Sequence, residues 1–142
     1  MKTRLFYLFL MAAALGCSKS DDSTPAPNAS GGCTVSFKGT TYSFTSAICV
    51  DGSLSGQPTI DGLTATDATA TKAFIIARDS ADPTSNSVSL NLNVSGSDVY
   101  VAAEGITSQP TITRSGKNWT FSGTASNGTD SGPISGSCTC SN

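Results

Sequence analysis

From Cys33 onward, the strongest pattern in this chain is an alternation of apolar and polar residues with a period of two. Val88, Leu90 and Leu92, for example, alternate with serine and asparagine. A β-strand turns successive side chains to opposite faces, so this period is typical of strands that bury one face. Clusters of Gly, Asn, Asp and Ser separate the segments. We therefore predict one all-β domain over residues 33–142, an antiparallel β-sandwich or a small closed β-barrel of about eight or nine short strands.

One segment near the start of this domain predicts a long strand. Tyr42, Phe44, Ser46, Ile48 and Val50 occur at every second position after a Gly-Thr turn. In an unbroken strand these side chains all point the same way. The alternation therefore predicts that they share one face of the sheet.

Two further segments are less regular. Residues 58–65 hold an Asp-Gly dipeptide between Ile60 and Leu63, which is consistent with a hairpin or with a bulged strand. Residues 72–78 form a short apolar run, Lys-Ala-Phe-Ile-Ile-Ala-Arg. Its shortness and its β-branched residues favour a strand with both faces buried over a helical turn.

The first residues of the chain are organised like a signal peptide. Lys2 and Arg4 precede residues 5–15, an unbroken apolar stretch. A bilayer-spanning helix needs about 20 apolar residues, so this stretch is too short to cross a membrane but has the length of a signal-peptide core. Small residues lie just before Cys17, as cleavage requires. We expect residues 1–16 to be removed as a signal peptide.

The sequence Ala14-Leu15-Gly16-Cys17 resembles the lipobox of bacterial lipoproteins, with Ala14 and Leu15 in the reverse of the usual order. The resemblance implies that the Cys17 sulfur receives a diacylglyceryl group, and that the chain is then cut before Cys17 and acylated on the new amine. Two or more acyl chains hold a protein firmly on a membrane, whereas one chain does so only marginally. A plain secretory signal followed by an unrelated cysteine is the alternative.

The segment after Cys17 indicates where the anchored chain goes. Residues 18–22 (Ser-Lys-Ser-Asp-Asp) resemble the lysine-plus-acidic signal that sends some lipoproteins to the outer face of the outer membrane, with a solvated spacer as the alternative. Ser, Asp, Pro and Gly dominate up to Gly32, so residues 17–32 are expected to form a lipidated N-terminus and flexible tether. The expected location is the outer membrane, lipid-anchored and facing the cell exterior.

The charge of the chain argues against one class of partner. It has 8 basic and 10 acidic residues, no histidine and a formal net charge of −2. Two of the basic residues, Lys2 and Arg4, belong to the expected signal peptide, so the mature chain is more acidic still. Nucleic acid is therefore not an expected partner, because no basic patch is present to neutralise phosphates.

Few residues offer catalytic chemistry. The absence of histidine removes the commonest general base and every Ser-His-Asp or Cys-His arrangement. A carboxylate pair for glycoside hydrolysis would come from Asp51, Asp61, Asp67, Asp98 and Glu104. Most of these have Gly, Ser or Thr neighbours, where Asp is expected for reasons of turn geometry. We expect no enzymatic activity, no cofactor and no metal site.

Five cysteines are present, at positions 17, 33, 49, 138 and 140. Lipidation of Cys17 leaves four, and an exported chain favours two disulfides over a zinc site, which usually shows closely spaced cysteine pairs. Cys138 and Cys140 are two apart on an expected strand, about 6.5–7 Å between Cα atoms, which is near the limit for a disulfide. Each therefore more plausibly pairs with Cys33 or Cys49, which leaves both connectivities open.

Three segments are similar to the small lipoprotein-antigen family of bacterial envelopes: residues 46–49, residues 115–125 and the terminal Cys140-Ser141. In that family a compact β domain follows a lipidated cysteine and a Ser/Thr-rich tether, and an early-strand cysteine pairs with the last one. The resemblance implies a Cys49–Cys140 disulfide, which leaves Cys33 for Cys138. It also implies surface exposure, immune recognition and adhesion.

The aromatic residues Trp119, Tyr100 and Tyr42 offer a groove for a sugar or an apolar ligand, and packing in the core is the alternative. Taken with the anchor, these features predict a non-catalytic outer-membrane lipoprotein for contact or adhesion. Its partners would be the membrane, through the lipid anchor, and a protein or glycan at the cell surface. A small β-barrel that carries a lipid or another apolar ligand is the alternative function.

Overall fold

A computed structural model describes residues 31–52, 59–96 and 98–141 of the chain. The expected signal peptide (residues 1–16), the lipidation site Cys17 and most of the expected tether (residues 17–32) lie outside the described residues. A helix that could cross a membrane is absent from the part of the chain that the structure describes.

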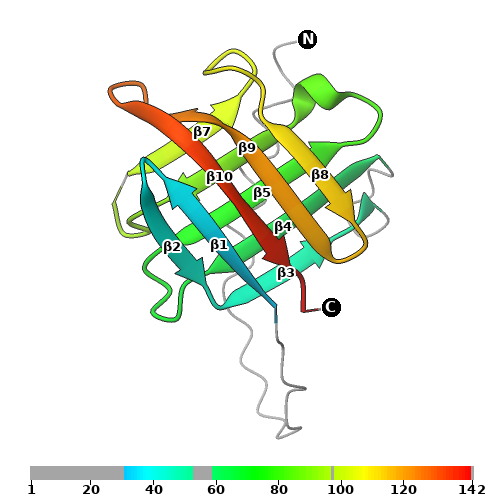
Figure 1. The fold of residues 1–142 in the computed structure, drawn as a ribbon, viewed down its shortest axis with the longest axis horizontal. Helices are drawn as coiled ribbons and strands as arrows, with labels where there is room; N and C mark the ends of the chain where they lie inside the picture. Colours follow the sequence, from blue (N-terminus) through cyan, green and yellow to red (C-terminus); the bar gives the residue numbers. More distant parts are fainter. Residues whose placement is uncertain (1–30, 53–58, 97, 142) are drawn as a thin grey trace, which may run out of the picture.

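The described residues form ten antiparallel strands in one sheet that nearly closes into a barrel (Figure 1). The strands are β1 (Gly32–Phe37), β2 (Thr40–Phe44), β3 (Ser46–Val50), β4 (Ile60–Thr66), β5 (Ala73–Asp79), β6 (Ser87–Asn91), β7 (Val99–Ala103), β8 (Thr111–Ser115), β9 (Asn118–Ser126) and β10 (Ser131–Thr139), with one 3₁₀ turn, η1 (Pro83–Ser85), between β5 and β6. The all-β prediction is confirmed, and the structure chooses a nearly closed barrel.

The sheet order is β2-β1-β10-β9-β7-β6-β5-β4-β3, and β8 also pairs with β9. In Figure 1, strands β2, β1, β10, β9 and β8 lie side by side in the nearer layer, while β7, β5, β4 and β3 cross behind them. The long strand β9 belongs to both layers, because its first half pairs with β8 and its last residue, Ser126, pairs with Val101 of β7.

The predicted long strand over Tyr42 to Val50 is in fact two strands, which raises the count to ten. The chain turns a corner at Thr45, whose backbone N–H donates to the carbonyl of Thr66 as pairing passes from β1 to β4. The corner shifts the alternation by one residue. Phe44 is buried, but Ala47 and Cys49 are the buried residues beyond the corner, and Ile48 is 48% exposed. The prediction of one shared face is therefore wrong for the second half.

Two other segment predictions are refined. The described part of the 58–65 segment, residues 59–65, contains no hairpin, because β4 runs through Asp61-Gly62 and pairs continuously with β5. Residues 72–78 contain a strand, β5, as predicted. Its faces are not both buried, since Phe74 points inward and Ile75 is 38% exposed on the outer face.

The interior of the barrel is filled by side chains from both layers. Phe74 of β5 lies with its ring centroid 5.8 Å from that of Phe44 and 4.8 Å from that of Phe121, and these two residues belong to the opposite layer. Towards one end, Phe37 and Tyr100 make a similar contact at 4.6 Å. The residues packed around these rings are Cys33, Val35, Ala47, Cys49, Leu63, Ala65, Ile76, Val88, Leu90, Ala102, Trp119, Ala125, Ile134, Cys138 and Cys140.

Gly136 makes this packing possible in the nearer layer. It lies in β10 between Val35 of β1 and Phe121 of β9. A Cβ atom at this position would lie 2.7 Å from Cζ of Phe121 and would also collide with the carbonyl oxygen of Thr34. The carbonyl of Thr34 and the ring of Phe121 therefore occupy the space that a side chain at 136 would need.

We predict that Gly136→Ala lowers the free energy of unfolding by about 1–3 kcal/mol, because it overpacks a filled core. Gly62→Ala is the matched control, since its Cβ would meet the carbonyl oxygen of Ile76 at an ordinary 3.5 Å. The control should leave stability unchanged or slightly raised, because alanine is less flexible than glycine in the unfolded chain. Urea denaturation measures both. Equal effects of the two substitutions would contradict this account of the core.

Candidate functional site

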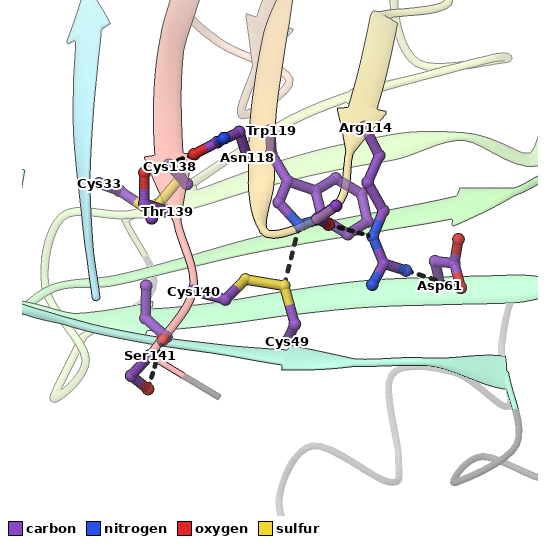
Figure 2. Close-up of a disulfide and its surroundings, with 12 residues drawn as sticks. Cys33, Cys49, Asp61, Arg114, Asn118, Trp119, Cys138, Thr139, Cys140 and Ser141 are labelled. Carbon is purple, nitrogen blue, oxygen red and sulfur yellow. Dashed lines mark hydrogen bonds and ion pairs between the residues drawn. A yellow bond between two sulfur atoms is a disulfide. The ribbon is translucent and has the colours of Figure 1, made fainter. Parts of the chain in front are cut away.

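The barrel has a seam where its sheet does not close. Among the described strands, β3 pairs only with β4, and β2 pairs only with β1. The C-terminal residues bridge this gap. The N–H and the hydroxyl of Ser141 both donate to the carbonyl oxygen of Ala47 in β3, at 2.9 Å and 3.0 Å. Cys140, the neighbouring residue, forms a disulfide with Cys49 of the same strand (Figure 2).

The second disulfide joins strands that are already paired. Cys33 of β1 lies directly opposite Cys138 of β10, with 4.0 Å between their Cα atoms. The Cys49–Cys140 disulfide that the lipoprotein-antigen resemblance implies is therefore confirmed, and so is the Cys33–Cys138 pair that remained. Together they use the thiols of all four cysteines of the domain. With Cys33–Cys138 formed, Cys49–Cys140 closes a further loop of about 20 residues, which the chain-entropy model values at about 3 kcal/mol.

Trp119 lies against the seam disulfide. Its indole Nε1 donates to the Sγ atom of Cys49 at 2.9 Å, and the residue is 0% exposed. The guanidinium carbon of Arg114 lies over the ring, 5.0 Å from its centre. The indole thus contacts a disulfide through its N–H edge and a cation over its ring, and its N–H has a hydrogen-bond partner although it is buried.

The structure does not bring the three candidate groove residues together. Trp119 is at the start of β9, whereas Tyr100 is in β7, which meets only the far end of β9. Tyr100 is 8% exposed and packs on Phe37, and Tyr42 is half-buried against the core. These side chains belong to the packed interior and its margin.

Three charged side chains cap the mouth of the barrel beside Trp119. Asp61 of β4 forms ion pairs with Arg114 of β8, at 3.0 Å, and with Arg78 of β5, at 3.6 Å. All three lie on the inward alternation of their strands, so they stand at the end of the core, and each side chain is only one-fifth to one-third exposed. Arg114 also donates from Nε to the carbonyl of Gly116 at 3.0 Å.

The opposite mouth has a different polar cluster. Lys38, after β1, donates from Nζ to Asp130, before β10, at 2.6 Å. The hydrogen bond from Lys38 lowers the pKa of the Asp130 carboxyl, and the same bond raises the pKa of the Lys38 ammonium. Burial, and then the charges of Asp98 and Asp130, raise the pKa of the neighbouring Tyr100. This pair ties the β1–β2 turn to the β9–β10 turn.

The remaining carboxylates are dispersed. Asp67 closes the β4–β5 loop by accepting from the N–H of Lys72 at 3.0 Å and from the hydroxyls of Thr69 and Thr71, which holds its pKa far below the ordinary value. Glu104 is exposed in an isolated bridge with Thr107 after β7. Asp51 follows β3. Within the described ranges, no group of three or more His, Cys, Asp or Glu side chains could hold a metal ion.

Neither charged cluster was predicted from the sequence, although the signal for the one at Asp61 was present. Asp61, Arg78 and Arg114 each lie two residues from an apolar residue of their strand, so the same alternation that defined the core also placed these charges inward. Asp61 is therefore a strand residue, not the turn residue that its glycine neighbour indicated.

No protein-family model matches the sequence, and no curated protein matches it. The geometry of the chain itself therefore carries the functional argument.

The contact between Trp119 and Cys49 predicts quenched fluorescence. Trp119 is the only tryptophan of the chain, and a disulfide at contact distance accepts an electron from an excited indole. Emission should rise several-fold in the double variant Cys49→Ala/Cys140→Ala and should stay near the wild-type value in the matched control Cys33→Ala/Cys138→Ala. Steady-state emission of the folded proteins measures this. Equal emission from the two variants would show that Trp119 does not contact the seam disulfide.

The Lys38–Asp130 pair predicts a defined pH window. The lowered pKa of Asp130 gives a contribution to stability that is present above the ordinary value of 3.8 and is lost as the pH falls through the folded-state value. The raised pKa of Lys38 gives a second contribution to stability, which is present below the ordinary pKa of 10.5 and is lost as the pH rises through the folded-state pKa.

Lys38→Met should therefore lower the thermal midpoint by a nearly constant amount between about pH 5 and pH 9, and by less at both extremes. Lys117→Met, on the exposed β8–β9 turn, is the control and should show no such window. Thermal denaturation across the pH range measures the difference. A deficit of Lys38→Met that grows below pH 4 would have the wrong sign for this ion pair.

Proposed function

We propose that this chain is a non-catalytic contact module of the bacterial cell surface, held to the outer membrane by fatty chains on Cys17. The observation that carries the proposal is the filled interior. Phe44, Phe74 and Phe121 are in ring contact across the barrel, and ion pairs stand at both mouths. Barrel carriers bind in the lumen or its mouth. Here the outer surface is left as the place where a partner can bind.

The geometry of the domain fits a tether that leads to a membrane. The first described residue, Gly31, lies close to Ser141 and Ala47 at the seam end of the barrel. A chain anchored at Cys17 would therefore enter at the mouth capped by Asp61. The opposite mouth, with Lys38 and Asp130, would point away from the membrane, and the outer faces of the sheet would be accessible from the side.

The carboxylates support a role without catalysis. A general acid or base needs a carboxyl that can exchange its proton with a substrate. Asp61 instead forms ion pairs with two guanidinium groups, Asp130 accepts a hydrogen bond from an ammonium group, and Asp67 accepts hydrogen bonds that close a loop. Each of these groups has a structural task within the chain.

The packing of the interior also argues against the alternative function, a carrier of a lipid or another apolar ligand. An apolar ligand needs a cavity of several hundred Å³ lined by apolar side chains, and the rings of Phe37, Tyr100, Phe74 and Phe121 occupy the space between the layers. Protein purified from its native membrane and extracted with organic solvent should yield only the acyl chains of Cys17. A further lipid in equimolar amount would favour the carrier.

The anchor predicts a specific consequence for Cys17→Ala. Wild-type chain should sediment with the outer membrane and should be cut by protease added to whole cells, because acyl chains hold it at the outer face. The variant should leave the membrane fraction and keep both disulfides of the domain. Mass spectrometry of the wild-type amino terminus should find acylated Cys17. A free thiol there, or a mature chain that starts elsewhere, would refute the anchor.

The contact role is tested on cells. A strain that lacks the chain should attach less to coated surfaces under flow than its parent. Wild-type chain should restore attachment, whereas Cys17→Ala should not, because the module is then no longer tied to the cell. Unchanged attachment of the deletion strain on surfaces coated with protein and with polysaccharide would contradict a contact function.

A further inference from the structure

The nearer layer of the barrel presents a regular array of hydroxyl groups on its outer face. Five strands, in the order β2-β1-β10-β9-β8, lie side by side (Figure 1). Strand register aligns their outward residues into two complete rows. The first row is Ser43, Thr34, Ser137, Thr120 and Thr113, and the second is Thr41, Ser36, Ser135, Ser122 and Thr111. We call these ten residues the hydroxyl face.

Within residues 31–52, 59–96 and 98–141, the hydroxyls of this face take no part in the hydrogen bonding of the fold. Cross-strand pairs of Ser and Thr often hydrogen-bond to each other and so stabilise a sheet. In the described structure none of the ten hydroxyls makes a hydrogen bond within the chain, although Thr139 in the next row does, to the side chain of Asn118 at 3.0 Å. Nine of the ten residues are exposed and Ser36 is half-buried. They are therefore available as donors and acceptors.

The opposite layer shows that this array is not a simple effect of composition. Its central outward row runs through Ile48, Thr64, Ile75, Ser89 and Val101. Apolar and polar residues alternate there, and Ile48 and Ile75 are 48% and 38% exposed. One sheet thus has a mixed outer face on one side and an unbroken hydroxyl face on the other.

The chemistry of the hydroxyl face selects its partner. The outward residues of these five strands include no charged and no aromatic side chain, since Arg114 of β8 points inward to Asp61. A charged polymer would lose hydration on this face without gaining an opposite charge. A protein partner would find none of the Trp, Tyr or Arg anchors that dominate protein interfaces. An uncharged polymer rich in hydroxyl groups has what the face can match.

The spacing of the array suits such a polymer. Neighbouring strands stand about 4.8 Å apart, so each row offers a hydroxyl at roughly that interval over about 20 Å, and the two rows lie about 6.7 Å apart. These intervals are comparable to the length of one sugar unit. An extended polysaccharide that lies across the strands would therefore meet several hydroxyls at once.

We propose that the hydroxyl face binds a neutral polysaccharide through many weak hydrogen bonds. This inference rests on the proposed contact function, because it names the surface and the class of partner through which contact would occur. Binding of a single domain should be weak, and many anchored copies on one cell should strengthen it through multivalency.

The test uses purified protein and insoluble polysaccharides. Wild-type chain should be retained on at least one neutral polymer among cellulose, starch, mannan and cross-linked dextran, and should not be retained on the anionic polymer alginate at the same ionic strength. Thr34→Val/Thr120→Val/Thr113→Val removes three hydroxyls of one row while it keeps side-chain shape, and should weaken retention at least about tenfold. Thr64→Val/Thr66→Val, on the opposite layer, is the control and should bind like wild type.

A second variant is needed in case the threonine-to-valine substitutions alter the face too little to change retention. Ser135→Lys/Thr120→Lys places two charges in the middle of the face and should abolish retention, while Thr64→Lys/Ser89→Lys places the same charges on the opposite layer and should not. Absence of retention on all four neutral polymers, or equal loss in the variants of both layers, would overturn the inference. If deletion of the chain still reduces cell attachment in that case, the contact function stands and only this face is wrong.

Discussion

The structure depends on how its seam is closed. The two strands at the ends of the sheet, β2 and β3, do not pair with each other, so backbone hydrogen bonding alone leaves the barrel open. The Cys49–Cys140 disulfide and the two hydrogen bonds from Ser141 to Ala47 join β3 to the end of the nearer layer across this gap, and the Asp61–Arg114 ion pair joins β4 to β8 at the mouth beside Trp119. A core that relies heavily on Val, Ala and Cys has little apolar area to spare, so these links matter for holding its two layers together.

Closure of the seam decides what kind of function the fold can have. Once the layers are joined, aromatic rings meet across the interior and charged side chains stand at both mouths, which is why we propose that partners bind to the exterior. The same strand alternation that sends Phe121 and Ile134 inward sends Ser122 and Ser135 outward. The filled core and the hydroxyl face are thus two results of a single sequence pattern, and we infer that the second is the functional one.

The fold class was predictable because it follows from local alternation, which a β-strand imposes on every residue. The corner at Thr45 was not, since the alternation shifts by one there only because pairing passes from one layer to the other, which is a tertiary event. Ile75 was misplaced inside for a different reason: a short apolar run does not show which face of the sheet is covered, and β5 buries only the face that holds Phe74 and Ile76. The disulfide pairing came from a family resemblance, whereas spacing alone left two connectivities. The inward positions of Asp61 and Arg78 follow from the period of their strands. The ion pair of Asp61 with Arg114 does not, because it depends on how the barrel brings β4 and β8 together.

Hydrogen exchange of the Ser141 amide, under native conditions, tests the closed seam most directly. This amide donates across the seam to Ala47, next to the Cys49–Cys140 disulfide. A closed barrel predicts that the Ser141 amide exchanges as slowly as amides in the middle of β10. In the Cys49→Ala/Cys140→Ala variant, which lacks the disulfide, the same amide should exchange quickly. Exchange in the wild-type protein at the rate of an exposed loop amide would contradict the closed barrel and the filled interior that rests on it.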